Sequence, residues 1–159
     1  MRILSIICLL ALCAAFMNCG GDSPQPNPPP EPTEEEIMKE ALTANGGTWG
    51  LGAGTTVVVT NGTNVNDVTD LLFEGFSIKF TDTGYTTTGD SPVWPQSDSW
   101  LFKTGTDGNV FVRNHDDMEV TIKSISTTEL QLELEWDQTT YEEGRAKSTA
   151  GTHLFTLKK

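Results

Sequence analysis

The run Leu130-Gln131-Leu132-Glu133-Leu134-Glu135-Trp136 alternates strictly between apolar and polar side chains. Because successive side chains of a β-strand point to opposite faces of a sheet, this run predicts a strand with one buried face and one solvated face. Half-buried strands are typical of antiparallel sheets, whereas parallel strands are covered on both faces and read as continuous apolar runs. The stretch therefore indicates an antiparallel all-β domain.

The same period of two recurs before and after this run. Residues 76–80 and 118–123 alternate as cleanly, and shorter segments bring the number of predicted strands to eight. The shorter segments are 55–60, 85–88, 99–103, 109–113 and 153–157. Turn-forming residues separate them, for example Asp82-Thr83-Gly84 and Thr106-Asp107-Gly108-Asn109. No segment of helical period lies between the strands, which excludes parallel βαβ units.

Eight antiparallel strands with mostly hairpin-length connections leave two sheet edges, and closure into a barrel removes both. We therefore predict a small eight-stranded antiparallel up-and-down barrel over residues 47–159, with a two-sheet sandwich as the alternative. A sandwich usually needs long crossovers, and only the segments 61–70 and 137–151 are predicted as longer loops. A barrel of this size can be filled by its own side chains.

A short helix is predicted directly before the barrel, over residues 33–46. Thr33 and Glu36 have the spacing of a capping box, in which each side chain accepts a hydrogen bond from the other residue's backbone N–H. Four apolar residues fall on one stripe of this helix: Ile37, Met38, Ala41 and Leu42. Because a helix of about three turns is marginal on its own, we expect the stripe to plug one end of the sheet structure.

Residues 1–18 are predicted to be a secretory signal peptide. Arg2 supplies the positive start, and the apolar segment 3–16 is shorter than the roughly 20 residues that span a bilayer. Cys8 and Cys13 would be removed with this segment. The box Phe16-Met17-Asn18-Cys19 resembles a bacterial lipoprotein signal of the looser Bacteroidetes type. That resemblance implies cleavage before Cys19 and a lipid on its sulfur.

Removal of the signal leaves Cys19 as the sole cysteine, so no intrachain disulfide is possible. A thiol at a chain terminus has no packing role, whereas each buried CH₂ of an acyl chain contributes about 0.8 kcal/mol of membrane affinity. We therefore predict Cys19 as the lipid-attachment site. Residues 19–32 hold six of the chain's eight prolines, which predicts an extended linker between the lipid and the helix.

The chain has 10 Lys and Arg against 22 Asp and Glu, a formal net charge of −12 at pH 7. Such an acidic surface repels nucleic acid and anionic lipid headgroups. No nucleic-acid partner is expected, and the membrane contact is assigned to the N-terminal acyl chains, palmitate among them. The expected location is the cell envelope, as an outer-membrane lipoprotein on the periplasmic side or at the cell surface.

The barrel segment resembles the lipocalin-like lipoproteins of Bacteroidetes. Gly47-Thr48-Trp49 matches the G-x-W that opens the first strand in the lipocalin superfamily, and 76–89 resembles the second hairpin of the lipoprotein group. Residues 99–134 are similar to its Trp-strand and meander, and 151–157 to its closing strand. The resemblance implies a lipocalin-like barrel that binds a small apolar or amphipathic ligand. It also implies a cation over the Trp49 indole, for which Arg145 and Lys147 are the candidates.

Aromatic residues on the buried phase of the strands are candidates either for the core or for the lining of a ligand cavity. The candidate ligand-binding residues are Trp49, Phe76, Phe80, Trp94, Trp100 and Trp136. Trp94 differs from the others because it lies in a loop between Pro92 and Pro95. We expect an exposed indole at this position, acting as a lid over the barrel or as a contact for a sugar or a protein.

No catalytic site is predicted. Asp82-Thr83-Gly84 occurs once, whereas aspartic proteases need two such carboxylates, and a β-turn explains the triplet. The run His115-Asp116-Asp117 is interpreted as turn residues, because zinc requires three or four ligands and the other histidine, His153, falls in a predicted strand. We expect no enzymatic activity, no metal and no cofactor.

Two functions remain open from the sequence. The first is a membrane-anchored lipoprotein whose barrel binds a small apolar or amphipathic ligand at the end near Trp94. The alternative is a non-enzymatic interaction or structural domain that docks another envelope protein or a glycan through Trp94 and the loop 141–145.

Overall fold

The computed structural model describes residues 29–142 and 145–159. The signal peptide, Cys19 and most of the linker lie outside the described residues. The chain divides between Glu31 and Pro32, and every described helix and strand belongs to the second unit, Pro32–Lys159. Within the described ranges, none of the helices has the length and hydrophobicity to cross a bilayer.

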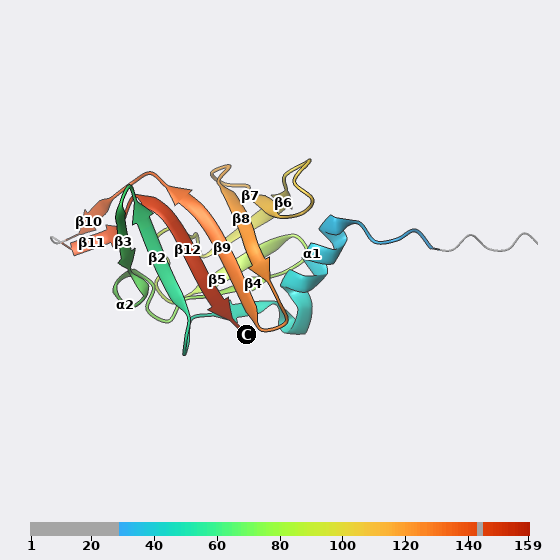
Figure 1. The fold of residues 1–159 in the computed structure, drawn as a ribbon, viewed down its shortest axis with the longest axis horizontal. Helices are drawn as coiled ribbons and strands as arrows, with labels where there is room; N and C mark the ends of the chain where they lie inside the picture. The colour runs from blue at the N-terminus through green and yellow to red at the C-terminus, as the bar shows by residue number, and fades with distance from the viewer. Residues whose placement is uncertain (1–28, 143–144) are drawn as a thin grey trace, which may run out of the picture. The chain divides into compact units, whose positions relative to one another are not determined.

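Eight strands form a closed antiparallel barrel (Figure 1). They are β1 (Thr48–Gly50), β4 (Ser77–Phe80), β5 (Gly84–Thr88), β6 (Ser97–Phe102), β7 (Val110–Arg113), β8 (Glu119–Ile125), β9 (Glu129–Trp136) and β12 (Gly151–Lys158). Neighbours in this order are hydrogen-bonded, and the ring closes where Gly50 pairs with Lys158. The prediction of an all-β eight-stranded barrel is therefore confirmed.

Strand β2 (Thr56–Asn61) corresponds to the predicted strand at 55–60, but it is not one of the eight strands that close the barrel. It pairs with β12 and forms a hairpin with β3 (Asn64–Asp67), so β3 is the free edge of the sheet. The three-residue strand β1 closes the ring in its place.

Two segments predicted as loops contain strands, so that prediction is wrong in part. Segment 61–70 contains β3, and segment 137–151 contains the hairpin of β10 (Thr140–Glu142) and β11 (Arg145–Ser148). All four residues of β3 are exposed. A strand without a buried face shows no apolar–polar alternation, which is the physical reason that the sequence pattern did not reveal it.

Helix α1 (Glu34–Thr43) begins as its capping box predicts. The Glu36 N–H donates to the Thr33 hydroxyl at 3.2 Å, and the Thr33 N–H donates to the Glu36 carboxylate at 2.8 Å. A 3₁₀ turn, η1 (Ala44–Gly46), follows the helix. The Trp49 indole N–H then donates to the carbonyl of the buried Leu42 at 3.0 Å. The helix thus covers one end of the barrel, as predicted.

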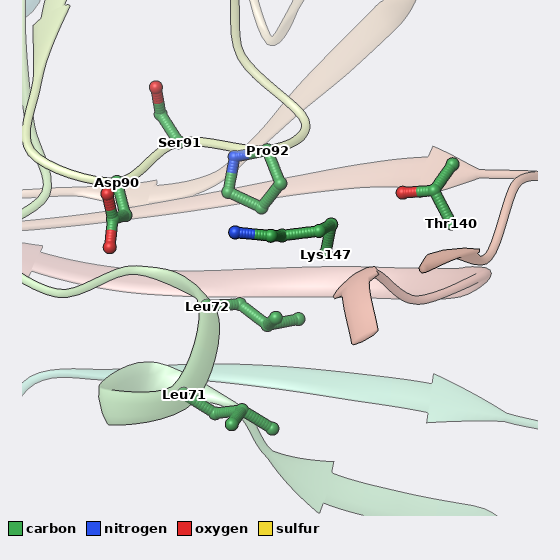
Figure 2. A pocket seen from close by; sticks show the side chains of 7 residues that line it. All are labelled: Leu71, Leu72, Asp90, Ser91, Pro92, Thr140 and Lys147. Carbon is green, nitrogen blue, oxygen red and sulfur yellow. The ribbon is translucent and has the colours of Figure 1, made fainter. Parts of the chain in front are cut away.

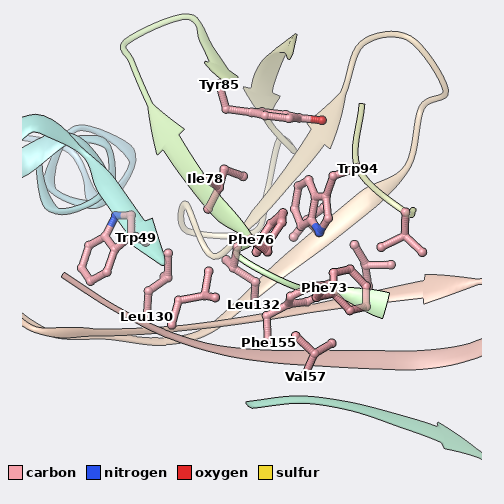
Figure 3. Close-up of a cluster of buried hydrophobic side chains, with 14 of the residues drawn as sticks. Trp49, Val57, Phe73, Phe76, Ile78, Tyr85, Trp94, Leu130, Leu132 and Phe155 are labelled. Atoms are coloured by element: carbon pink, nitrogen blue, oxygen red, sulfur yellow. The ribbon is translucent and has the colours of Figure 1, made fainter. Parts of the chain in front are cut away.

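The barrel interior is filled with side chains (Figure 3). Phe73, which follows the short helix α2 (Thr69–Leu72), meets Phe155 of β12 with ring centroids 5.1 Å apart. Phe76 lies 5.6 Å from Phe155, and Phe80 lies 5.8 Å from Phe111. The Phe73–Phe155 and Phe80–Phe111 pairs meet edge to face, a geometry that is favourable beyond the area buried. Burial of these inward-facing residues supplies the main driving force for the fold.

Candidate ligand-binding site at the barrel mouth

The two ends of the barrel are built differently. Helix α1 lies at one end, while α2 and the hairpin β10–β11 lie at the opposite end (Figure 1). Strand β5 ends and strand β6 begins at this second end, so the segment 89–96 that connects them lies there too. We call this second end the mouth. The chain enters the folded unit at α1, so the mouth is the end away from the linker attachment.

Trp94 fills the mouth from inside and is only 4% exposed. Its ring lies 5.4 Å from Tyr85 and 5.7 Å from Phe155. The segment turns back locally, since the Trp94 N–H donates to the Ser91 carbonyl at 3.1 Å. The expectation of an exposed indole is therefore wrong. The flanking prolines lie in a loop, as predicted. This loop folds inward, and its Trp94 side chain closes the end of the barrel.

Arg113 is a buried cation that holds the plug in place, with only 1% of it exposed. Its Nη1 donates to the Val93 carbonyl at 2.5 Å, and its Nε donates to Asp116 Oδ1 at 3.1 Å. Nη2 pairs with the second oxygen of Asp116, which makes the ion pair bidentate. The guanidinium carbon lies 5.3 Å from the Trp94 ring centroid, a cation–π distance. Strand β7 is thereby joined to the segment over the mouth.

The other candidate aromatics divide between the two ends. Trp49, Phe80 and Trp100 are buried toward α1. Phe76 lies beside Trp94, and the half-buried Trp136 ends β9 at the mouth. The cation over Trp49 is Lys159, whose Nζ lies 4.2 Å from the ring centroid. Lys147, one of the two residues expected there, lines a pocket at the mouth instead.

This pocket has a volume of about 530 Å³. We call it the mouth pocket; it is lined by Leu71, Leu72, Asp90, Ser91, Pro92, Thr140 and Lys147. Three separate segments supply these residues: α2, the start of the segment 89–96, and the hairpin β10–β11. Figure 2 shows the Lys147 side chain lying between the Pro92 ring and Leu72. Apolar and charged groups therefore face the same space.

Some polar groups of the mouth pocket form hydrogen bonds within the protein, and others do not. Ser91 Oγ donates to the Trp94 carbonyl at 3.3 Å, and Thr140 Oγ1 lies 2.9 Å from Ser148 Oγ. The Asp90 backbone N–H donates to the Glu74 carbonyl at 2.9 Å. For the Asp90 carboxylate, no hydrogen bond or ion pair is found with the part of the chain that the structure describes. Asp90 is thus the lining acid that is available to a ligand.

Several buried polar atoms near the mouth lack protein partners among the described residues. They include Nε1 of Trp94, Nε1 of Trp136 and Nε2 of His153. His153 Nδ1 lies 3.1 Å from the Gly151 carbonyl, which must accept, so the ring proton is on Nδ1 and Nε2 is an acceptor. Burial lowers the pKa of His153 below its ordinary value and favours the neutral ring. The Tyr85 hydroxyl, next to Trp94, is a further unpaired group, so two indole donors, one hydroxyl and one imidazole acceptor lack partners among the described residues.

The residues Asp98, His115 and Asp116 lie close together on the surface near β6 and β7. His115 Nδ1 is 2.9 Å from Asp98, and Asp116 accepts from the Met118 N–H at 3.2 Å. Burial alone would raise the pKa of Asp98, but the hydrogen bonds from the His115 ring and backbone keep it below its usual value. These contacts hold the turn between β7 and β8, which agrees with the interpretation of His115 and Asp116 as turn residues.

Comparison with known proteins adds no family assignment, since no protein-family model, curated protein or solved structure matches this chain. The candidate site therefore depends on its own geometry.

Sequence reasoning missed both Arg113 and the lining of the mouth pocket. For Arg113 a signal was present: it has the same phase as the buried Phe111 on β7, and Asp116 follows three residues later. For Leu72, Asp90 and Thr140 no local pattern points to a shared pocket, because each belongs to a different segment of the chain.

Proposed function

We propose that the protein is an envelope lipoprotein whose barrel mouth binds a small amphipathic ligand. The ligand-binding half of the proposal rests on one observation: an open pocket of about 530 Å³ is lined by both apolar and charged side chains. Small-molecule sites are concavities of roughly 300–1,000 Å³ with apolar walls and a few polar groups. The mouth pocket has this size and this mixture.

The filled interior supports a ligand position above the barrel core. Trp94, Phe73 and Phe155 occupy the space below the mouth. A ligand in the mouth pocket keeps these contacts intact and rests its apolar part on Leu71, Leu72 and Pro92. Entry into the barrel would require removal of the Trp94 side chain, with loss of its packing and of its contact with Arg113.

The anchoring half of the proposal rests on the sequence of residues 1–32. A cysteine at the expected cleavage point and a proline-rich linker fit a lipid tether, and the resemblance to lipocalin-like lipoproteins supports it. Because the linker joins the folded unit at α1, a tether of this kind leaves the mouth at the far end of the barrel.

Replacement of Cys19 with serine is expected to move the protein from the membrane fraction to the soluble fraction. Serine offers no thiol for the lipid, so the acyl chains that contribute about 0.8 kcal/mol per CH₂ are lost. Fractionation of cells with immunoblotting, together with mass spectrometry of the mature N-terminus, measures the change. Cys13→Ser is the matched control and should stay with the membrane. Membrane retention of the Cys19→Ser protein, or an unmodified native terminus, would contradict the anchor.

Replacement of Leu71 with serine is expected to weaken ligand binding roughly tenfold, because burial of a leucine side chain contributes about 1.5–3 kcal/mol. Leu71 lines the mouth pocket and is 71% exposed, so the fold should tolerate the change. The measurement is a ¹H–¹⁵N NMR titration with octanol, octylamine and octanoate. We expect at least one compound to shift amides of the mouth pocket residues.

The matched control is Leu101→Ser, since Leu101 is 76% exposed on β6 and does not line the mouth pocket. This variant should bind as the native protein does. If the Leu71→Ser and Leu101→Ser proteins bind all three compounds equally, the mouth pocket is not the ligand site.

A docking domain for another envelope protein is the second candidate. The observation in its favour is that Val65, Leu71 and Tyr141, three large exposed apolar side chains, belong to β3, α2 and β10. Large apolar side chains that are exposed to solvent are available for contact with a partner protein. A docking domain predicts that none of the three octyl compounds shifts the mouth amides, and that Tyr141→Ser abolishes association with the partner.

A further inference from the structure

We propose that the mouth pocket is selective for organic cations, that is, for amphiphiles that carry an ammonium group on an apolar chain. This inference rests on the proposed function and names the ligand class for the same site. Three features support it: the free carboxylate of Asp90, the net negative charge of the chain, and the position of the apolar walls of the mouth pocket.

Asp90 supplies the acceptor for the ammonium group. Its carboxylate lines the mouth pocket, and the described part of the chain offers it neither a hydrogen bond nor an ion pair. The hydroxyls of Ser91 and Thr140 are already engaged within the protein. An ammonium group would give Asp90 a charge-assisted hydrogen bond, which is roughly twice as strong as a neutral one. An anionic head would instead face this carboxylate at close range.

The net charge of the chain favours a cation as well. Asp70 on α2 precedes the pocket residue Leu71, and the Glu74 carbonyl bonds to the Asp90 backbone. Of the cationic side chains that the structure describes at this end, Arg113 is buried against Asp116, and Lys147 lines the mouth pocket together with Asp90. The other end carries charges of both signs, since Glu34, Glu35 and Glu36 begin α1 and Lys159 lies over Trp49 there. The net charge of −12 favours the approach of cations to the chain as a whole.

The apolar walls of the mouth pocket indicate that the ligand also has an apolar part. Leu71 and Leu72 lie across the pocket from Asp90 and Pro92 (Figure 2). A ligand with its ammonium group at Asp90 therefore places an attached chain against α2. A bare metal ion or a short polyamine would leave this wall uncovered, whereas an alkyl or aryl amine covers it.

The test compares three compounds of one chain length: octylamine, octanol and octanoate, followed by NMR titration of the mouth amides. We expect octylamine to bind most tightly and octanoate least tightly. Asp90→Asn should lower the octylamine affinity roughly tenfold, as expected for loss of one charge-assisted hydrogen bond, and change the octanol affinity less than twofold. Added NaCl should weaken octylamine binding alone.

Asp82→Asn is the matched control, because Asp82 lies in the exposed turn between β4 and β5 at the α1 end. It should leave all three affinities unchanged. Equal binding of octylamine and octanoate, or no effect of Asp90→Asn, overturns the cation selectivity while the proposed function stands. If none of the compounds shifts the mouth amides, the proposed function fails, and the selectivity fails with it.

Discussion

Replacement of Trp94 with alanine is expected to lower the free energy of unfolding by about 3–5 kcal/mol, the usual cost of truncating a buried aromatic side chain. Trp94 packs on Phe76, Tyr85 and Phe155, and it supplies the ring against which Arg113 lies. Alanine leaves a cavity beneath the mouth that these neighbours cannot all fill. Because a domain of this size has a total stability of about 5–15 kcal/mol, the urea midpoint measured by circular dichroism should fall strongly.

Leu101→Ala is the control for this experiment, since Leu101 is exposed on β6. Its free energy of unfolding should stay within about 0.5 kcal/mol of the native value. Trp94→Phe should fall between the two, because phenylalanine keeps part of the packing. A Trp94→Ala protein with the native urea midpoint would show that the indole does not close the barrel.

Replacement of Arg113 with alanine is expected to cost about 3–5 kcal/mol, the range found when one partner of a buried ion pair is removed. The change leaves the Val93 carbonyl without its donor, removes the cation beside Asp116 and uncovers one face of Trp94. Asp116→Asn should cost less, because the Asp116 side chain is 26% exposed and solvent compensates in part. Urea unfolding measures both changes.

Lys103→Ala is the matched surface control. Lys103 pairs with Glu119 at 2.6 Å, but both side chains are about half exposed, so the loss should lie near 0.5 kcal/mol. Arg113→Lys keeps the charge without the planar fork and should recover only part of the stability. If Arg113→Ala and Lys103→Ala prove equally mild, Arg113 does not hold the segment 89–96 over the mouth.

The barrel could be predicted because its strands have one wet face and one buried face. The run from Leu130 to Trp136 is strand β9 within one residue, and the strands on either side follow the same rule. Helix α1 was equally visible, because Thr33 and Glu36 satisfy backbone groups that every helix start leaves unpaired. Local chemistry and periodicity are enough for such elements.

The parts that could not be predicted lack this local signal. β3 is exposed on both faces, and the hairpin β10–β11 forms a separate two-stranded sheet. The inward turn of Trp94 depends on Arg113, a residue 19 positions later in the sequence. Periodicity carries no information about such a tertiary contact. The prolines correctly indicated a loop, but the prediction that this loop exposes the indole was wrong.

The candidate site was predicted only by its place in the fold. The sequence pointed to the end of the barrel near Trp94, and the mouth pocket includes Ser91 and Pro92 from that loop. Its other walls come from α2 and from the hairpin β10–β11. Five of the six aromatic candidates are buried in the core, Trp136 packs against it, and none of the six lines the mouth pocket.

A crystal structure of the protein with octylamine tests the central claim most directly. We predict electron density for the amine in the mouth pocket, with its ammonium group beside Asp90, its chain against Leu71 and Leu72, and the Trp94 indole in the same buried position. Density inside the barrel with the Trp94 side chain turned out would contradict the account, as would an amine bound only away from the mouth.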